Sequence, residues 1–251
     1  MIVYPNAKIN LGLNILKKRE DGYHEISSVF YPLFETIDIL EIKKSENFSF
    51  SSTGIEIPIG ENLCEKAWSL FKNDFGIGNV KIHLHKQITI GGGLGGGSSN
   101  ASFTLKALNK IFKLNLTNNE LKRYALKLGA DCPFFIDNEA KIVGGIGEKM
   151  TKCNLDLSNF KIKLIDPKIH ISTKEAYSTI QPRHTEFSIN KIIQLPIKEW
   201  KNYLRNDFEE SLIKKHPIIK EKKEELYEKG AVYASMSGSG SVVYGIFNKQ
   251  K

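Results

Sequence analysis

The feature that most constrains the fold of this chain is the run from residue 91 to residue 97, in which six of seven residues are glycine. Glycine brings no side chain to a core and loses more backbone entropy on folding than any other residue, so the run does not serve packing. Directly behind it, Ala101, Leu105, Leu108 and Phe112 recur at helical spacing. The run therefore opens a helix whose first N–H groups and positive dipole end point to one place, which predicts a phosphate site.

The rest of the chain mixes strands and helices. Strand patterns occur at residues 7–15, 38–43, 48–52, 80–85 and 160–165. The Asp21-Gly22 dipeptide predicts a hairpin turn, and helices are expected at 62–75 and from Thr117, with its capping-box partner Glu120, to Gly129. A strand, the glycine turn SGSGS and a second strand close the sequence. This order predicts an α+β fold, and a turn-rich stretch near residue 155 predicts two domains, 1–155 and 156–251.

The net charge of +8, from 36 Lys and Arg against 28 Asp and Glu, first suggests a nucleic-acid partner. Residues 198–229 form the most charge-dense stretch, and their nine basic and eight acidic residues nearly cancel. This stretch is typical of a solvated helical face with intermixed ion pairs. We therefore expect no nucleic-acid partner and a modest positive field that favours small anionic substrates.

Membrane insertion and secretion are not expected from the sequence. No apolar run approaches the roughly 18 residues that span a bilayer, and MIVYPNAKIN lacks the pattern of a signal peptide. The three cysteines, Cys64, Cys132 and Cys153, are far apart and form no C-x-x-C pair, which argues against disulfides and a zinc site. We expect a cytoplasmic protein with no membrane partner.

Three common phosphate-binding patterns do not fit the glycine run. A Walker loop needs a lysine before Ser98, and none is present. The dinucleotide fingerprint matches, but almost any glycine tract matches it, and helices follow where it requires a second strand. The H-R-D and D-F-G elements of protein kinases do not occur.

The run ITIGGGLGGGSSNAS instead resembles the phosphate loop of the GHMP small-molecule kinases, which wraps the triphosphate of ATP. PNAKINLGLNI at 5–15, DGYHE at 21–25, LGADCP at 128–133 and SGSGS at 237–241 resemble further motifs of that family in the same order. One departure is Thr89, where the family usually has proline; it affects only the stiffness of the loop entry.

This resemblance implies the two-domain GHMP kinase architecture, with the active site in the cleft between the domains. It implies transfer of the γ-phosphoryl group of ATP, with Mg²⁺ expected alongside, to the hydroxyl of a small molecule. DGYHE favours the members that phosphorylate the 2-hydroxyl of a cytidine diphosphate ester of methylerythritol, in the non-mevalonate route to isoprenoids. The alternatives are a GHMP kinase for another alcohol, such as homoserine or mevalonate, and a basic RNA-binding module. The oligomeric state stays open between a monomer and a weak homodimer.

The resemblance also assigns roles to single residues. Asp131 matches the catalytic base and Lys8 the catalytic lysine, whereas by themselves they would be interpreted as a helix N-cap and a solvent-facing strand lysine. The expected substrate-binding residues are Asn10, Tyr23, His24, Thr173 and Tyr177. The expected ATP-binding residues are Thr89, Ile90, Gly91, Gly92, Gly93, Leu94, Gly95, Gly96, Gly97, Ser98 and Ser99. Ser98 and Ser99 also suit the N-cap of the following helix. No cluster of side chains has the spacing of a metal site.

Overall fold

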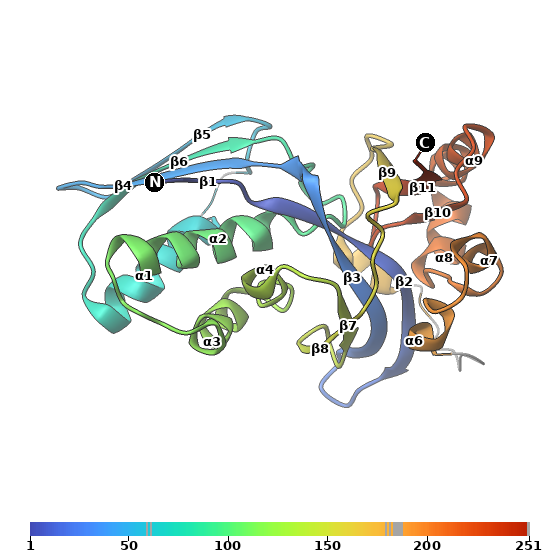
Figure 1. The fold of residues 1–251 in the computed structure, drawn as a ribbon, viewed down its shortest axis with the longest axis horizontal. Coiled ribbons are helices and arrows are strands. Elements are labelled where there is room, and N and C mark those ends of the chain that lie inside the picture. The colour runs from blue at the N-terminus through green and yellow to red at the C-terminus, as the bar shows by residue number, and fades with distance from the viewer. Residues whose placement is uncertain (59, 61, 179, 181, 183–187, 250–251) are drawn as a thin grey trace. The chain divides into compact units, whose positions relative to one another are not determined.

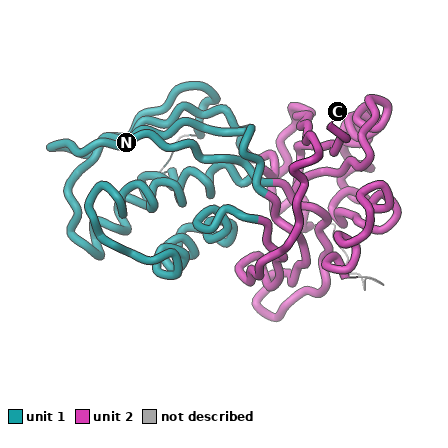
Figure 2. Tube along the Cα trace, viewed as in Figure 1, with its two compact units in different colours: residues 1–8, 32–90, 95–139 teal, residues 9–31, 91–94, 140–251 magenta. Residues whose placement is uncertain are grey.

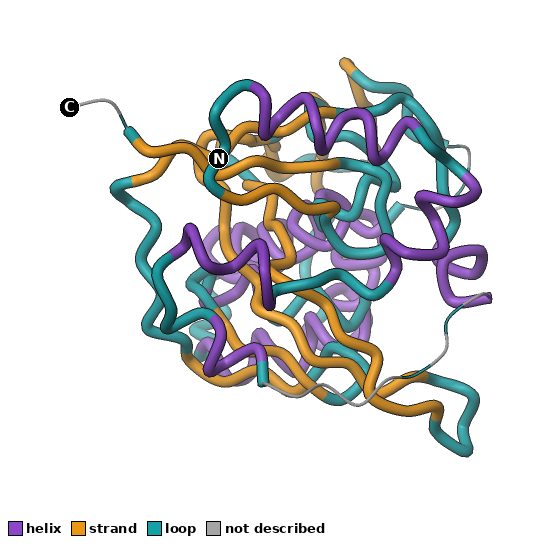
Figure 3. Tube along the Cα trace, turned by 90° about the vertical axis from the view of Figure 1, so that its right-hand side faces the viewer, coloured by secondary structure: helices purple, strands orange, loops and turns teal. Residues whose placement is uncertain are grey.

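The computed structural model describes residues 1–58, 60, 62–178, 180, 182 and 188–249. Figure 1 shows its helices and strands along the chain, and Figure 3 shows the same elements by type. Helices and strands both run through the whole chain, and antiparallel pairing dominates the sheets, which confirms the predicted α+β class. No helix of the described part is long and apolar enough to cross a membrane.

The chain forms two compact units, each built from separated segments (Figure 2). Unit 1 contains residues 1–8, 32–90 and 95–139, and unit 2 contains residues 9–31, 91–94 and 140–251. Two long strands, β2 (Asn6–Lys18) and β3 (His24–Ile37), contribute residues to both units, and so does the glycine run. The domain boundary near residue 155 divides the sequence in a different way and stays a prediction.

Unit 1 is a four-stranded sheet with helices on one face (Figure 1). The strand order is β1 (Ile2–Val3), β4 (Ile39–Lys44), β6 (Val80–Lys86) and β5 (Ser49–Gly54), of which only β5 and β6 pair in parallel. Its helices are α1 (Leu63–Phe75), α2 (Gly96–Ile111), α3 (Asn118–Leu128) and α4 (Phe134–Asp137). Apolar side chains of the sheet, α1, α2 and α3 share one core. This core holds α2, and therefore the end of the glycine run, rigidly against the sheet.

The helix ends of unit 1 have clear local causes. Gly76 ends α1 in the left-handed conformation, as expected, and Asn62 and Glu65 form a capping box at its start that the sequence analysis did not predict. Thr117 and Glu120 form a second capping box at the start of α3. These side chains satisfy N–H groups that a helix start leaves without partners, which explains why both helices begin where the sequence predicts.

Unit 2 contains two sheets. One has the order β2, β3, β7 (Lys141–Gly144) and β8 (Lys149–Lys152), and the other has the order β10 (Tyr233–Met236), β11 (Val243–Asn248) and β9 (Phe160–Ile165). Its helices are α5 (Thr173–Ser178), α6 (Ile189–Ile192), α7 (Ile197–Tyr203), α8 (Phe208–Lys215) and α9 (Ile218–Glu228). The charge-dense stretch lies on α7, α8 and α9, where pairs such as Lys220 with Glu224 connect successive turns. The predicted intermixed ion pairs are therefore present.

Strand β2 differs from the usual alternating strand in one respect. Its apolar residues are buried as expected, but the polar residues between them are buried as well: Lys8 is 3% exposed and Asn10 is 2% exposed. The interpretation of Lys8 as a solvent-facing lysine is therefore wrong. A buried polar side chain needs partners, and those of Lys8 in unit 1 and of Asn10 in unit 2 are described below, each within its own unit.

Candidate active site

Lys8 lies beside Asp131 in unit 1. The Lys8 Nζ is 3.5 Å from an Asp131 carboxylate oxygen, and the Asp131 side chain keeps 33% of its surface exposed. Burial lowers the pKa of Lys8, while the Asp131 charge and a hydrogen bond to Asp131 act in the opposite direction. The pair therefore joins a buried cation to a carboxylate that a substrate can reach.

A short turn presents Asp131. The helix α3 ends at Gly129, and the N–H of Cys132 donates to the Gly129 carbonyl at 3.1 Å. The hydroxyl of Ser102, on α2, donates to the Cys132 carbonyl at 2.7 Å. The N-cap of α4 is Pro133, so the interpretation of Asp131 as an N-cap is wrong. The carboxylate is left to face Lys8.

The N-terminus of α2 lies close to Lys8 in space. Its N-cap is Gly95, which has φ +69° and makes no side-chain cap hydrogen bond. A Cβ on Gly95 would lie 3.1 Å from the Lys8 Cγ and 3.0 Å from the Phe135 ring, so glycine gives the lysine the space it needs. The predicted N-cap role of Ser98 and Ser99 is wrong because Gly95 occupies that position.

Ser99 lies in the first turn of α2. Its hydroxyl is fully buried and has no hydrogen-bond partner among the residues that the structure describes. The features that suit a phosphate group are the N–H groups at the start of α2, which no side chain caps, and the adjacent lysine.

In unit 2, residues 91–94 pack against the C-terminal glycine turn 237–241. The Ser237 hydroxyl donates to the Gly93 carbonyl at 2.9 Å, and the Val242 N–H donates to the Gly92 carbonyl at 3.3 Å. Gly93 has φ +76°, and a Cβ there would lie 1.9 Å from the Ser237 carbonyl oxygen. The backbone at residue 93 therefore packs directly against the backbone of Ser237, and only glycine fits at residue 93.

Asn10 contacts the same turn. Its N–H donates to the Ser237 hydroxyl at 3.1 Å, and its side-chain amide donates to the Ser28 hydroxyl at 2.9 Å. Ser28 in turn donates to the Gly12 carbonyl at 2.6 Å. Sequence reasoning missed Ser28 and Ser237 as partners of Asn10. The SGSGS motif was the available signal for Ser237, whereas Ser28 carried none.

Two of the other expected substrate contacts lie together in unit 2. The rings of His24 and Tyr177 are 5.0 Å apart, and Tyr177 packs edge-on against Phe208 at 4.8 Å. Tyr23, beside His24, is 61% exposed and free to stack on a planar ligand. Burial and the nearby Lys18 lower the pKa of His24, which favours a neutral imidazole that both donates and accepts. Thr173 is exposed at the start of α5.

Thr89 and Ile90 form the entry to the glycine loop. Thr89 is half-buried and Ile90 is exposed, directly before residues 91–97. The described residues contain no group of three or more His, Cys, Asp or Glu side chains that could hold a metal ion. The chain offers no all-protein cage for Mg²⁺ in that part.

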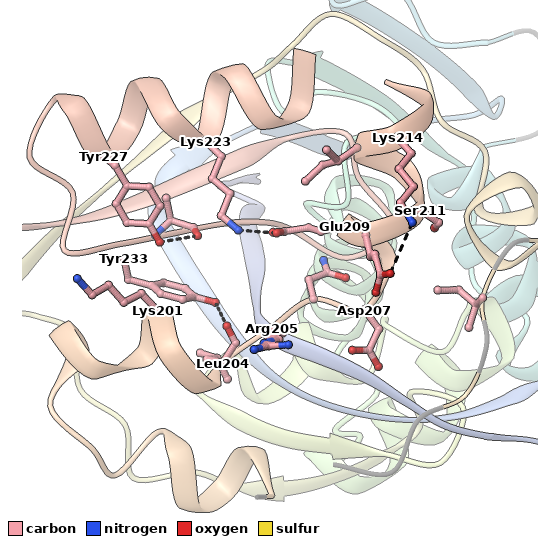
Figure 4. A pocket seen from close by; sticks show the side chains of 15 residues that line it. Lys201, Leu204, Arg205, Asp207, Glu209, Ser211, Lys214, Lys223, Tyr227 and Tyr233 are labelled. Atoms are coloured by element: carbon pink, nitrogen blue, oxygen red, sulfur yellow. Dashed lines mark hydrogen bonds and ion pairs between the residues drawn. The ribbon is translucent and has the colours of Figure 1, made fainter. Parts of the chain in front are cut away.

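A separate pocket of about 730 Å³ lies in unit 2 (Figure 4). It is bordered by α7, α8, α9 and β10, and the Lys223 Nζ contacts the Glu209 carboxylate in its wall at 2.5 Å. The Tyr233 hydroxyl donates to the Leu204 carbonyl at 3.2 Å. None of the predicted site residues lines this pocket, so it is not the predicted ATP or substrate site.

Comparison with known proteins agrees with the motifs. The chain is 49% identical to the 4-diphosphocytidyl-2-C-methyl-D-erythritol kinase of Bacteroides thetaiotaomicron, over 100% of this chain and 93% of that protein. It also matches a crystal structure of 4-(cytidine 5'-diphospho)-2C-methyl-D-erythritol kinase with a TM-score of 0.84 and 30% identity, covering 98% of this chain and 90% of the other. Residues 62–139 match the model of the GHMP kinases N terminal domain, and residues 191–251 match that of the GHMP kinases C terminal.

The chain belongs to the GHMP kinase family. The resemblance drawn from its motifs is thereby confirmed. Its GHMP fold extends to proteins of other specificity: a crystal structure of mevalonate kinase matches with a TM-score of 0.69 over 99% of this chain and 91% of the other. That protein is only 16% identical, so the likeness shows the common fold and does not favour the alternative substrate.

Proposed function

We propose that the chain transfers the γ-phosphoryl group of ATP to the 2-hydroxyl of 4-diphosphocytidyl-2-C-methyl-D-erythritol, in the non-mevalonate route to isoprenoid precursors. The relatives that share nearly half of its residues carry this activity in their names. The observation that carries the proposal is the Lys8 and Asp131 pair beside the N-cap glycine of α2. It joins a reachable carboxylate, a buried cation and an anion-binding helix start in one unit.

The reaction assigns a distinct task to each part of the pair. Asp131 accepts the proton of the substrate hydroxyl as its oxygen forms a bond to the γ-phosphorus of ATP. The bond between that phosphorus and the β,γ-bridging oxygen breaks, and ADP leaves. Lys8 offsets the negative charge that develops in the transition state. Positioning and electrostatics supply the catalysis, as expected for phosphoryl transfer.

ATP binds along the loop 89–99 with its phosphates at the start of α2, where no side chain caps the N–H groups. Mg²⁺ accompanies ATP and is held by phosphate oxygens and water, which suits a chain whose described residues form no metal cage. No step of the reaction is assigned to protein ligands of the metal.

The cytosine of the substrate stacks on Tyr23 and is read by His24, with Tyr177 packed behind His24. Asn10 and Thr173 complete the substrate contacts. The partners are therefore two small polyanions, and the positive net charge supplies a background field for them. We place the enzyme in the cytoplasm, in keeping with its three buried free cysteines.

The test is a coupled ADP-release assay over a panel of acceptors. Turnover with 4-diphosphocytidyl-2-C-methyl-D-erythritol, and at least a hundredfold less with homoserine or mevalonate, is expected. A substrate site that hydrogen-bonds a base typically rejects ligands without it by about 10⁴-fold or more. Equal or better turnover of homoserine or mevalonate would assign another alcohol. Salt-dependent RNA binding without ATP turnover would favour the RNA-binding alternative.

A further inference from the structure

Both ends of the glycine loop meet at one buried carboxylate in unit 1. Asp38, between β3 and β4, is 0% exposed. Its Oδ1 accepts hydrogen bonds from the N–H groups of Gln87, at 2.7 Å, and Ile88, at 2.9 Å, which lead into the loop. Its Oδ2 accepts from the Lys86 Nζ at 2.5 Å and from the side-chain amide of Asn100 at 2.8 Å. Asn100 lies on α2, directly behind the loop.

Lys86 brings this network into contact with the loop itself. A Cβ on Gly96, the first residue of α2, would lie 2.8 Å from the Lys86 Nζ and 2.9 Å from the Ile88 Cγ2. The lysine ammonium therefore packs directly against the start of α2. Burial lowers the pKa of Lys86, and the Asp38 charge opposes that shift. A carboxylate with four donors and no exposure is closed to substrate, so this pair holds structure in place.

We propose that Asp38 is a positioning residue for ATP, which fixes the entry and the exit of the glycine loop so that the N–H groups at the start of α2 are aligned before the triphosphate arrives. This inference rests on the proposed function and adds to it. A loop tethered at both ends gives up less conformational freedom on binding than one tethered at neither end. Loosening one tether therefore weakens ATP binding and leaves the acceptor contacts unchanged.

Asn100→Ala is the variant that tests the tether most cleanly, because the Asp38 and Lys86 ion pair stays intact. Thr104→Val is its matched control: Thr104 is equally buried on the same helix, and its hydroxyl donates to the Asn100 carbonyl at 2.8 Å, within α2. Asn100→Ala should raise the KM for ATP about tenfold, the effect of one hydrogen bond to a charged group. The KM for the acceptor and kcat at saturating ATP should change less than twofold.

Thr104→Val should leave both KM values within twofold of the unmodified enzyme. Asp38→Asn should raise the KM for ATP more than Asn100→Ala does, because it disturbs both tethers. An unchanged KM for ATP in Asn100→Ala, or a parallel rise in both KM values, would overturn the positioning role while normal wild-type turnover upholds the proposed function. Failure of the unmodified chain to turn over ATP would overturn both.

Discussion

Two buried lysines, each paired with an aspartate, lie against consecutive glycines of the same loop, and the two pairs differ in the exposure of the carboxylate. Lys8 adjoins Gly95, and its Nζ is 3.5 Å from an Asp131 carboxylate oxygen. The Asp131 side chain keeps 33% of its surface exposed. Lys86 adjoins Gly96, and its partner Asp38 is fully buried, with four donors. The first carboxylate has capacity left for a substrate proton, and the second has none.

Burial of a charged pair does not by itself mark a catalytic site. The completeness of the hydrogen bonding around the carboxylate separates the two cases. A fully satisfied pair fixes geometry, whereas a pair with one accessible carboxylate can exchange a proton. This distinction gives the two aspartates opposite expected effects on rate and on stability.

The largest effect is expected on the rate, from Asp131→Asn. The amide keeps the shape of the side chain but accepts no proton, so kcat should fall about 10²–10⁴-fold, the usual contribution of a general base. Steady-state ADP release at saturating substrates measures it. Asp137→Asn is a control from the neighbouring helix α4, where Asp137 pairs with Lys122, and it should keep kcat within threefold. A loss of less than tenfold in Asp131→Asn would contradict the assignment.

The next effect concerns the free energy of unfolding, which Asp38→Asn should lower more than Asp131→Asn does. Removing one partner of a buried ion pair costs about 3–5 kcal/mol of unfolding free energy, because the other charge is left without compensation. Asp38→Asn should therefore show such a loss in urea unfolding. Asp131→Asn should lose less than Asp38→Asn, because it removes a single contact at 3.5 Å to Lys8, whereas Asp38 accepts four hydrogen bonds. Equal losses at the two positions would remove the distinction between the pairs.

The smallest effect is a shift of the alkaline decline of kcat to lower pH. Burial holds the pKa of Lys8 below its ordinary 10.5, so the ammonium loses its proton at a lower pH than an ordinary lysine does. A decline of kcat should therefore begin at a lower pH than for an ordinary lysine. Lys8→Arg keeps its charge throughout this range, and its residual activity should show no such decline. The same alkaline decline in Lys8→Arg would assign it to another group.

Local elements were predictable because their signals are local. The helix at 62–75 follows from an apolar stripe that ends at Gly76, the helix behind Thr117 follows from its cap with Glu120, and the hairpin follows from Asp21-Gly22. The glycine run predicted a phosphate site because no core requires it, and the family followed from the resemblance of the motifs. These features depend on backbone conformation over a few residues, which sequence patterns report directly.

The second pair could not be predicted from spacing. Asp38 lies 48 residues from Lys86 and 62 residues from Asn100, and only the folded sheet brings them together. Alternation in β2 also failed to show that its polar face is covered, because a pattern along one strand does not report what packs on it. The N-cap at Gly95 was missed for a related reason: its left-handed conformation replaces the side-chain cap that Ser98 and Ser99 suggest.

A single-turnover experiment on the two lysines tests directly whether the Lys8 and Asp131 pair is catalytic and the Lys86 and Asp38 pair is not. With ATP and acceptor both saturating, rapid-quench measurement of the Lys8→Met and Lys86→Met enzymes isolates the transfer step from ATP affinity. Lys8→Met should slow transfer about 10²-fold or more, as expected for lost charge stabilisation, and Lys86→Met should stay within about threefold of the unmodified enzyme. Equal slowing by both variants, or a normal rate in Lys8→Met, would contradict this assignment.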